Sequence, residues 1–587
     1  MSDSLPDRLL LMGILAVCAT ALAPTHAFAS PPAAVRVASA DADISGDYAQ
    51  TDTVTSTGDV YHVSLTLTQG ASGDLTGTGI AHNSLGDHAY TVTGQVSGSS
   101  ITYKRSDKDS SYIADFTGTV SGDTLSGTWT DSNGLSGTWI ATRGPRGPNV
   151  TIDWTMPERL TDAIQERWTR RGWYGLPSWK YINPTSWEVN LFLTREGKPA
   201  CPPGVAYRWR VIGEGIDESL PDSGCKVRTT VPKLGRYRVT ATEVSGGTAP
   251  GTVIENDNVV VRDWLIVGLG DSNGSGEGNP PFVFPQCDRS LSSYQYRTAK
   301  YIEDHDPRSS VTFLFASCSG ARTDHLWKNA YAGIQPSEGP PLPPQIDQVK
   351  QRLGKRMPRK VDAVIMSIGI NDLYFGSIME FCILAHLNTY DEGCAGHWVK
   401  PVKDARGYVT EYESDDANHQ GRARYTATLL YQTNTRVQAL PGKFAAVSSH
   451  LAAINPSHVF LTQYPAIAHD FSGKLCTAGE GAFPAFSQST WQWLSNVGDA
   501  LNNAVLASAA AYGWTGVTGI PEGFFRHGYC AGTQSYFRSL RQALPKNKDG
   551  TFHPNPRGHA VSYQETKASV CEALYGNQNC DGLPPAP

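Results

Sequence analysis

In the second half of the chain, the apolar residues fall in short continuous runs that are separated by stretches with helical spacing. Continuous runs are typical of parallel strands that are buried on both faces. Between the runs, Ile346, Val349 and Leu353 recur at helical spacing, as do parts of 425–451 and 491–511. The pattern predicts an α/β fold, a three-layer α/β/α sandwich around a parallel sheet. The five expected strands are Trp264–Leu269, Val311–Ala316, Val361–Ile368, His458–Leu461 and Trp514–Val517.

A β-rich unit is expected near the N-terminus. From 44 to 143, Gly, Ser and Thr alternate with apolar residues, and turns such as Asn133-Gly134 interrupt the alternation. A period of two broken by such turns predicts antiparallel hairpins, and therefore a small β-barrel or β-meander. A short theme recurs in this unit, as Leu75-Thr76-Gly77-Thr78-Gly79, Phe116-Thr117-Gly118-Thr119-Val120, Leu125-Ser126-Gly127-Thr128-Trp129 and Leu135-Ser136-Gly137-Thr138-Trp139.

A second β-rich unit follows a linker. The segment Gly144-Pro145-Arg146-Gly147-Pro148 favours neither helix nor strand, so it marks a boundary. Beyond it, Tyr207–Val211 and Arg236–Thr240 alternate as strands do, and the turn Leu234-Gly235-Arg236-Tyr237 resembles those of PKD or immunoglobulin-like sandwiches. The expected domains are 44–143, 150–262 and 263–587.

The first 29 residues have the pattern of an export signal. Arg8 precedes an apolar run from Leu9 to about Leu22, and the segment ends in Ala27-Phe28-Ala29. The run is shorter than the roughly 20 residues that a spanning helix needs, so a membrane anchor is the weaker interpretation. We expect cleavage after Ala29 and a secreted, extracellular protein.

The cysteines fit an exported chain. Of the 11 cysteines, Cys18 lies in the expected signal, which leaves an even number. No pair has the C-x-x-C spacing of structural zinc sites, so disulfides are favoured over zinc. The sequence leaves the connectivity open. Pairing neighbours in order would give Cys201–Cys225, Cys287–Cys318, Cys382–Cys394, Cys476–Cys530 and Cys571–Cys580.

Composition and motifs disfavour several classes of function. Charged residues make up 18% of the chain and the formal net charge is −6, which gives no electrostatic footprint for nucleic acid. The Gly-rich segment after the first run lacks Gly-Lys-Ser and Gly-Lys-Thr, so a nucleotide cofactor is not expected. Asp271, Asp372 and His553 could in principle bind a metal ion, but aspartates in loops of this kind are commonly structural. We expect no metal and no organic cofactor.

Chemically useful side chains follow the expected strands, at the sheet edge where ligands of α/β proteins collect. The first run ends in Gly270-Asp271-Ser272-Asn273-Gly274, which matches the G-x-S-x-G nucleophile elbow, although in α/β-hydrolases that serine follows several earlier strands. An isolated serine here would more often cap a helix. Gly320 follows the second run, Asn371 follows the third, and His553 lies in a loop near the C-terminus.

This ordered set resembles the SGNH, or GDSL-type, hydrolase family, which is named for Ser, Gly, Asn and His in successive blocks. The likeness spans about 259–575, and the segments around Ser272 and Gly320 look like those of exported actinobacterial-type esterases and lipases. The resemblance implies that Ser272 is the nucleophile and His553 the general base. It also implies an oxyanion hole made of the N–H groups of Ser272 and Gly320 and the side-chain amide of Asn371.

The sequence departs from the family pattern near the histidine. The family's third catalytic residue usually precedes the histidine by three positions, where this chain has Gly550. Asp549 lies one residue further back, so either the loop bulges to bring Asp549 to the imidazole, or a backbone carbonyl orients the ring. His559 is a rival base, but the preceding Pro-Arg-Gly looks like a helix cap, which favours a structural role.

The expected activity is hydrolysis of carboxylic esters (EC 3.1.1 class) through an acyl-enzyme on Ser272. His553 must be neutral to accept a proton, so activity is expected to rise through an ordinary histidine pKa of about 6.5. The substrate stays open among small esters, lipids and acetylated glycans. Two alternatives are a carbohydrate acetyl esterase and a surface- or polymer-binding protein with a vestigial hydrolase domain, whose β units would bind a polymer or cell surface.

Overall fold

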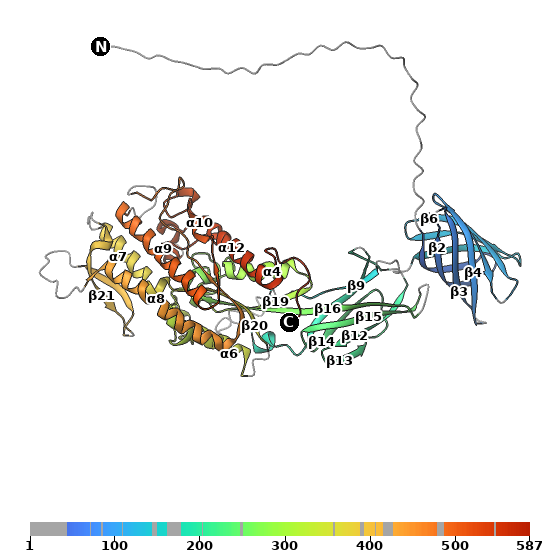
Figure 1. Ribbon diagram of the computed structural model, residues 1–587, viewed down its shortest axis with the longest axis horizontal. Coiled ribbons are helices and arrows are strands. Elements are labelled where there is room, and N and C mark those ends of the chain that lie inside the picture. The colour runs from blue at the N-terminus through green and yellow to red at the C-terminus, as the bar shows by residue number, and fades with distance from the viewer. Residues whose placement is uncertain are drawn as a thin grey trace, which may run out of the picture.

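The computed structural model arranges the chain as three units in a row, with a β-barrel at one end, an α/β domain at the other and paired β-sheets between them (Figure 1). The expected signal at 1–29 and the linker at 144–148 lie outside the described residues. The structure describes residues 44–70, 72–83, 86–108, 110–143, 150–160, 178–195, 197–201, 204–246, 251–355, 359–387, 393–405, 407–414, 427–477, 486–544 and 547–587.

The first unit is a closed antiparallel barrel, which is one of the two architectures that the alternating pattern predicts. Each strand pairs with the next one along the chain, and the last strand closes the barrel against the first, with Tyr48 opposite Arg143. The strands are β1 (Gly46–Val54), β2 (Val60–Gln69), β3 (Asp74–Asn83), β4 (Gly86–Ser97), β5 (Ser100–Asp107), β6 (Ile113–Ser121), β7 (Thr124–Asp131) and β8 (Ser136–Arg143).

Aromatic rings and one ion pair fill the barrel. Tyr103 stacks on Phe116 at 4.5 Å between ring centroids, and Arg105 donates to the buried carboxylate of Asp52 at 2.8 Å. Glycines of the recurring theme make room for the rings, since a Cβ on Gly118 would lie 2.8 Å from the indole of Trp139. The theme therefore serves packing.

The middle unit consists of two sheets around one core. One sheet contains β9 (Val150–Thr155), β10 (Trp187–Arg195), β11 (Lys198–Pro199) and β14 (Lys226–Val231). The other contains β12 (Ala206–Gly213), β13 (Ile216–Ser219), β15 (Gly235–Ser245) and the start of β16 (Val253–Gly270). Buried side chains of both sheets form a single cluster, which includes Trp154 and Trp209. A PKD or immunoglobulin-like topology stays a prediction.

Strand β16 runs without a break from the middle unit into the α/β domain. It pairs with β15 up to Val261 and with β19 from Arg262 onward. The boundary expected between 262 and 263 therefore falls inside a strand, where the pairing partner changes. The two units share this backbone, and a salt bridge from Arg308 to Asp153 at 2.9 Å joins them a second time.

The C-terminal unit has the predicted parallel sheet, in the order β19-β16-β20-β24-β25. All five apolar runs are strands, which confirms the prediction. Helices α4 and α12 lie on one face and α5, α6 and α8 on the other, so the sheet is the middle of three layers (Figure 1). The elements are β19 (Ser309–Phe315), β20 (Val361–Ser367), β24 (Pro456–Thr462), β25 (Thr515–Val517), α4 (Tyr294–His305), α5 (Thr323–Trp327), α6 (Gln345–Leu353), α8 (Leu429–Leu451), α9 (Gln488–Ala511), α10 (Ile520–Phe524) and α12 (Pro556–Tyr575).

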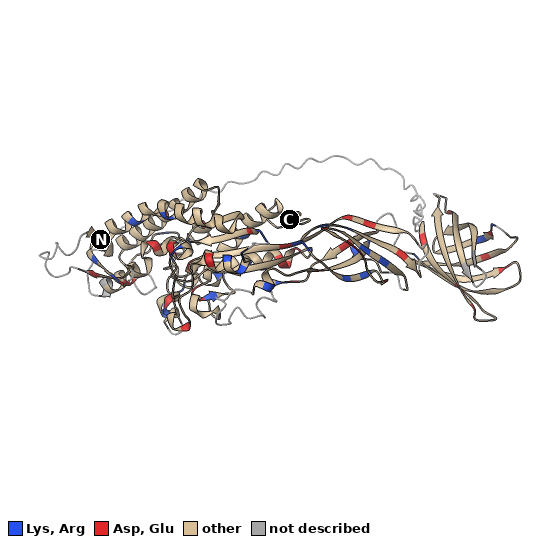
Figure 2. Cartoon of the chain, turned by 90° about the horizontal axis from the view of Figure 1, so that it is seen from below, with Lys and Arg blue, Asp and Glu red and all other residues tan. Residues whose placement is uncertain are grey.

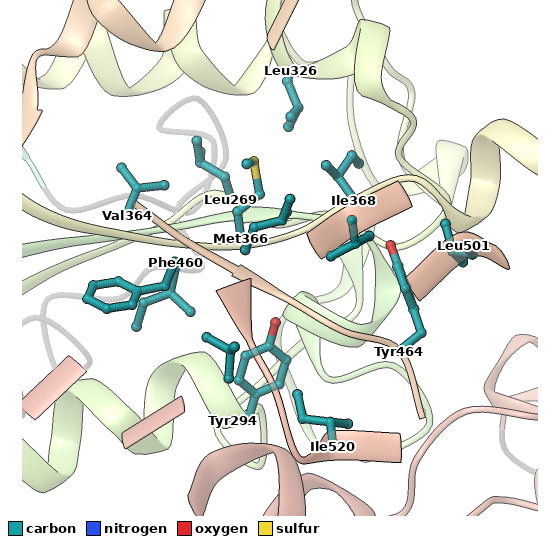
Figure 3. Packing of buried hydrophobic residues seen from close by; sticks show 14 of the residues in the cluster. Leu269, Tyr294, Leu326, Val364, Met366, Ile368, Phe460, Tyr464, Leu501 and Ile520 are labelled. Carbon is teal, nitrogen blue, oxygen red and sulfur yellow. The ribbon is translucent and has the colours of Figure 1, made fainter. Parts of the chain in front are cut away.

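Apolar side chains from the strands and from the helices above and below them fill the space between the layers. Figure 3 shows Val364 and Met366 of β20 and Phe460 of β24 among side chains from neighbouring elements. All three are fully buried. This packing fixes the strand ends from which the candidate site residues project.

The connection between β20 and β24 forms structure that the sequence did not reveal. It contains the helix α7 (Phe375–Leu387) and a small antiparallel sheet of β21 (Trp398–Lys403), β22 (Val409–Ser414) and β23 (Ala427–Thr428). Helix α7 packs against β22 and contributes to the wall of the candidate site.

Five disulfides join neighbouring cysteines in order. They are Cys201–Cys225, Cys287–Cys318, Cys382–Cys394, Cys476–Cys530 and Cys571–Cys580. Acidic and basic residues are interspersed along the three units, in keeping with the small net charge (Figure 2). In the described part of the chain, no helix has both the length and the hydrophobicity to cross a bilayer.

Candidate active site

The backbone turns sharply at the end of β16 and presents Ser272. Gly270 has a φ of +122°, and a Cβ there would lie 1.9 Å from the carbonyl oxygen of Ser367, so only glycine fits. Ser272 begins the short helix α3 (Ser272–Ser275), and the cap of this helix is Asp271, whose carboxylate accepts from the N–H of Asn273 at 3.1 Å. Ser272 is therefore not needed as the cap.

Hydrogen bonds hold the buried side chain of Asp271 in place. Its carboxylate accepts hydrogen bonds from the hydroxyls of Tyr464 and Ser367, the latter at 3.0 Å. Burial raises the pKa of Asp271 to about 7, although these hydrogen bonds oppose the rise. These contacts fix the residue before Ser272.

One cavity brings the predicted site residues together. It has a volume of about 540 Å³. Ser272, Gly320, Asn371, Asp549 and His553 all line it, although they come from four distant parts of the chain. Ser272, Gly320 and Asn371 follow β16, β19 and β20, the three adjacent strands at which the order of the sheet reverses. Such a reversal is where open α/β sheets bind ligands.

Two backbone N–H groups in this cavity are free to bind an anion. Within the described part of the chain, neither the N–H of Ser272 nor that of Gly320 has an acceptor. Gly320 has a φ of +79°. The side-chain nitrogen of Asn371 donates one hydrogen to the carbonyl of Ala321 at 3.0 Å, which fixes the amide and leaves its second hydrogen available. Three donors can therefore converge on one oxygen.

His553 is oriented by a backbone carbonyl. Its Nδ1 lies 3.1 Å from the carbonyl oxygen of Thr551. A carbonyl only accepts, so Nδ1 carries the hydrogen and Nε2 keeps the lone pair that a general base needs. Among the described residues, no hydrogen bond joins the ring to the carboxylate of Asp549. Sequence reasoning foresaw a carbonyl as one of two possibilities but could not name Thr551.

The environment of His553 favours the neutral ring. Desolvation lowers the pKa of His553 to about 4, while the hydrogen bond to Thr551 and the charge of Asp549 act in the opposite direction. The ordinary value of about 6.5 used for the sequence-based expectation is therefore too high for this buried ring. Neutral His553 is the dominant form over most of the pH range.

His559 has a structural environment. It is fully buried in α12, it stacks on Tyr294 with ring centroids 6.3 Å apart, and burial lowers its pKa to about 3. The cap expected before it is provided by Asn555, whose side chain accepts from the N–H groups of Arg557 and Gly558. His559 does not line the cavity.

The aspartates considered as metal ligands are engaged elsewhere. Asp372 accepts from the N–H and hydroxyl of Thr323 at 2.9 and 2.7 Å, and it pairs with the ammonium of Lys443 at 2.9 Å. Asp271 is bound as described above. Within the described ranges, no group of three or more His, Cys, Asp or Glu side chains is arranged to hold a metal ion.

The rest of the cavity is mainly apolar, although Glu380 and Lys548 also line it. Its walls come from helices α7 and α9 and from the segment before His553, and sequence reasoning did not assign them to the site. The apolar side chains include Leu373, Met379, Ile383, Leu494, Val497 and Leu501. Gly498 lies among them on α9, and a Cβ there would meet nothing within 4 Å. Helical spacing predicted α9, but the face it turns to the site depends on the tertiary fold.

Comparisons with known proteins find one family and several solved structures that resemble the C-terminal half of the chain. Residues 269–561 match the model of the GDSL-like lipase/acylhydrolase family. Similar solved structures include an extracellular lipase from Streptomyces rimosus (21% identity, TM-score 0.34, 51% of this chain and 96% of the lipase). A phospholipase A1 from Streptomyces albidoflavus is 18% identical, with a TM-score of 0.32 over 51% of this chain and 95% of the phospholipase. An acetylxylan esterase from Geobacillus stearothermophilus is 12% identical, with a TM-score of 0.24 over 53% and 94%. No curated protein matches the chain.

Proposed function

Residues 269–561 belong to the GDSL-like lipase/acylhydrolase family, and on this premise we propose that the chain is an exported serine carboxylic-ester hydrolase with Ser272 as nucleophile and His553 as general base. The observation that carries the proposal is the shared cavity. It combines the Ser272 hydroxyl, the His553 ring and two unpaired backbone N–H groups. This combination suits attack on a carbonyl carbon and stabilisation of the oxyanion that results.

The reaction follows from these positions. Nε2 of His553 takes the proton of the Ser272 hydroxyl while Oγ bonds to the ester carbonyl carbon. The N–H groups of Ser272 and Gly320 and the amide of Asn371 stabilise the oxyanion, and His553 then protonates the departing alcohol. Water attacks the acyl-enzyme by the same route in reverse, which releases the acid and restores Ser272.

The carbonyl of Thr551 replaces a catalytic carboxylate in this proposal. A carbonyl fixes the ring tautomer as a carboxylate would, but it brings a weaker charge to stabilise the imidazolium. Asp549 supplies part of that charge, since its carboxylate raises the pKa of His553, although no hydrogen bond joins this carboxylate to the ring among the described residues. We therefore assign Asp549 a supporting electrostatic role.

The shape of the cavity favours acyl groups of medium or long chain over acetyl. An acetyl group would leave most of about 540 Å³ of mainly apolar space unfilled. Each buried methylene of an acyl chain contributes about 0.8 kcal/mol, so a chain that lies along α7 and α9 adds binding energy. We propose a lipase or long-chain esterase as the main activity and rank a carbohydrate acetyl esterase below it.

Hydrolysis of nitrophenyl esters from two to sixteen carbons tests this. We expect kcat/KM of the wild type to rise with chain length. Gly498→Leu fills the space beside α9 and should lower kcat/KM for the twelve-carbon ester by ~10- to 100-fold, while the acetate ester changes by less than about 3-fold.

Gly442→Leu is the matched control for this experiment. Gly442 also lies within a long helix with nothing near its Cβ position, but it is outside the cavity, so its variant should keep the wild-type chain-length profile. A wild-type preference for the acetate ester, or an equal response of all chain lengths to Gly498→Leu, would contradict the proposed substrate.

Export and the role of the β units are also proposed. Five disulfides are typical of proteins that fold outside the cytoplasm, which supports secretion. We propose that the barrel and the middle unit present the hydrolase domain to a polymer or a cell surface. Covalent labelling of Ser272 by a fluorophosphonate would separate an active enzyme from a binding protein with a vestigial domain.

A further inference from the structure

Two buried carboxyl groups lie behind the candidate active site, where three of its segments meet. Glu277 follows Ser272 by five residues, and Asp288 comes next to Cys287, whose disulfide leads to Cys318 and so to the segment of Gly320. Both side chains belong to residues that are at most 1% exposed. Among the described residues, no salt bridge pairs either carboxyl group with a cation, and an unpaired charge is costly in the interior.

One amide bridges the two carboxyl groups. The side-chain nitrogen of Asn547 lies 2.5 Å from Oε1 of Glu277 and 3.3 Å from Oδ2 of Asp288. Asn547 begins the loop that leads to His553, and its side-chain oxygen accepts from the N–H of Gly550 at 3.2 Å. The carboxyl groups therefore contact the histidine loop through a residue about 260 to 270 positions away in sequence.

A second contact joins the same two segments. The side-chain nitrogen of Asn279 donates to the carbonyl oxygen of Pro554, the residue after His553, at 2.8 Å. The backbones also touch, since a Cβ on Gly550 would lie 2.6 Å from Cα of Gly278. Residues 277–279 therefore contact the loop that carries His553 both before and after this residue.

We propose that Glu277, Asp288 and Asn547 form a clamp that sets the position of His553 relative to Ser272, with one proton shared between the two carboxyl groups. They are positioning residues, since none of them lines the cavity. The inference rests on the proposed function, because it concerns the same nucleophile and base.

The pKa values of the two carboxyl groups shift in the direction expected if the groups share one proton. Burial raises the pKa of Glu277 and raises that of Asp288 to about 8, and the charge of Glu277 adds to the effect on Asp288. Asp549, from the histidine loop, raises it further. Arg289 follows Asp288 in sequence, but its guanidinium donates to the carbonyl oxygens of Ser317 and Ala316.

The neutral groups that face the pair are hydrogen-bond donors. Ser319 donates to Glu277 and Gln335 donates to Asp288, and both bonds lower the pKa of the carboxyl they contact. Two carboxylates with one proton attract, whereas two ionised carboxylates repel. The clamp should therefore hold below about pH 8 and loosen above it.

Steady-state hydrolysis of nitrophenyl butyrate by the full chain tests the clamp. Asn547→Ala should lower kcat by at least ~10-fold with KM within about 2-fold, because a base displaced by a fraction of an ångström slows the chemistry while the cavity still binds substrate. Asn577→Ala is the control, since Asn577 also closes a turn through its side chain but lies near the C-terminus, away from the cavity. Both variants should remain folded at the assay temperature, which thermal unfolding checks.

The pH profile gives a second, independent readout. The wild-type kcat should fall above about pH 8, when the shared proton is lost. In Glu277→Gln the amide can donate to ionised Asp288, so this alkaline decline should move upward by at least about one pH unit or disappear. A purely structural role for Glu277 would not shift the profile.

Each outcome decides between the proposals. A kcat of Asn547→Ala equal to that of the control, or a Glu277→Gln profile that superimposes on the wild type, overturns the clamp and leaves the proposed function standing. If Asn547→Ala does not fold, the Glu277→Gln profile decides alone. Wild-type protein without Ser272-dependent hydrolysis overturns the proposed function and the clamp with it.

Discussion

The barrel and the hydrolase domain use glycine in different ways. In the barrel, Gly118 lies within a strand, and the absence of a side chain lets the indole of Trp139 pack across the backbone. In the hydrolase domain, Gly270 ends β16 and Gly320 follows β19, both at positive φ, and the absence of a side chain lets the backbone turn toward the cavity. One use fills a core, whereas the other exposes reactive groups.

The same contrast appears in the range of the contacts. Every pair of neighbours in the barrel except β1 and β8 is adjacent in the chain, so local pairing builds most of it. The hydrolase site assembles residues between positions 272 and 553. In this chain, a glycine-rich motif lines a cavity where it follows a buried parallel strand, and it packs a core where it lies inside an antiparallel strand. Substitutions in the two regions should therefore change different properties.

The largest expected effect is loss of activity on removal of the nucleophile or base. Ser272→Ala and His553→Ala should each lower kcat by ~10⁴- to 10⁶-fold, because neither half of the proton transfer works alone. Nitrophenyl ester hydrolysis measures the loss, and circular dichroism checks the fold. Residual activity of a tenth of the wild type in either variant would contradict the assignment.

A smaller loss is expected from the oxyanion hole. Asn371→Ala removes one of three donors and should lower kcat by ~100- to 1,000-fold. The hydrogen bond to Ala321 is lost as well, but it contributes only about 1 kcal/mol to folding, so thermal unfolding should shift little. Unfolding of the domain together with the loss of rate would point to a structural role for Asn371.

A barrel glycine should affect stability and leave the rate unchanged. Gly118→Val places atoms against Trp139 and against the carbonyl of Ser126, and overpacking of this kind costs about 1–3 kcal/mol. Calorimetry should show a lower unfolding temperature for the barrel, with kcat per folded molecule within about 2-fold of the wild type. A large fall in kcat would mean that the barrel takes part in catalysis.

The smallest expected effect is that of mild acidity. With the pKa of His553 lowered to about 4, the base stays neutral above this value, and activity is lost only as the pH falls through it. The value of kcat/KM should change by less than about 2-fold between pH 5.5 and 7. An unperturbed imidazole would instead lose about 10-fold by pH 5.5. Stopped assays in buffers of constant ionic strength distinguish the two.

The sequence predicted the architecture because the signals were local. Buried parallel strands appear as continuous apolar runs, and the alternation in 44–143 predicted antiparallel hairpins, although it left open whether they close into a barrel. Ser272 and His553 were predicted from a family resemblance, and the structure brings them to one cavity. Their catalytic roles stay predictions until the variants are measured.

Other features depend on tertiary contacts and carry no local signal. The carbonyl of Thr551 is a backbone group, which any residue would supply. The closeness of Glu277 to Asn547 arises only when the last loop returns to the first strand. The apolar faces of α7 and α9 that line the cavity look like ordinary core positions in the sequence.

The unbroken strand β16 has a consequence for how the enzyme meets its substrate. At 18 residues and roughly 3.3 Å per residue it is about 60 Å long, and it ends at the turn that presents Ser272. A loop in its place would act as a hinge, whereas a strand that is paired on both sides of the boundary resists such rotation. Any surface to which the middle unit binds would therefore fix the direction in which the candidate cavity faces.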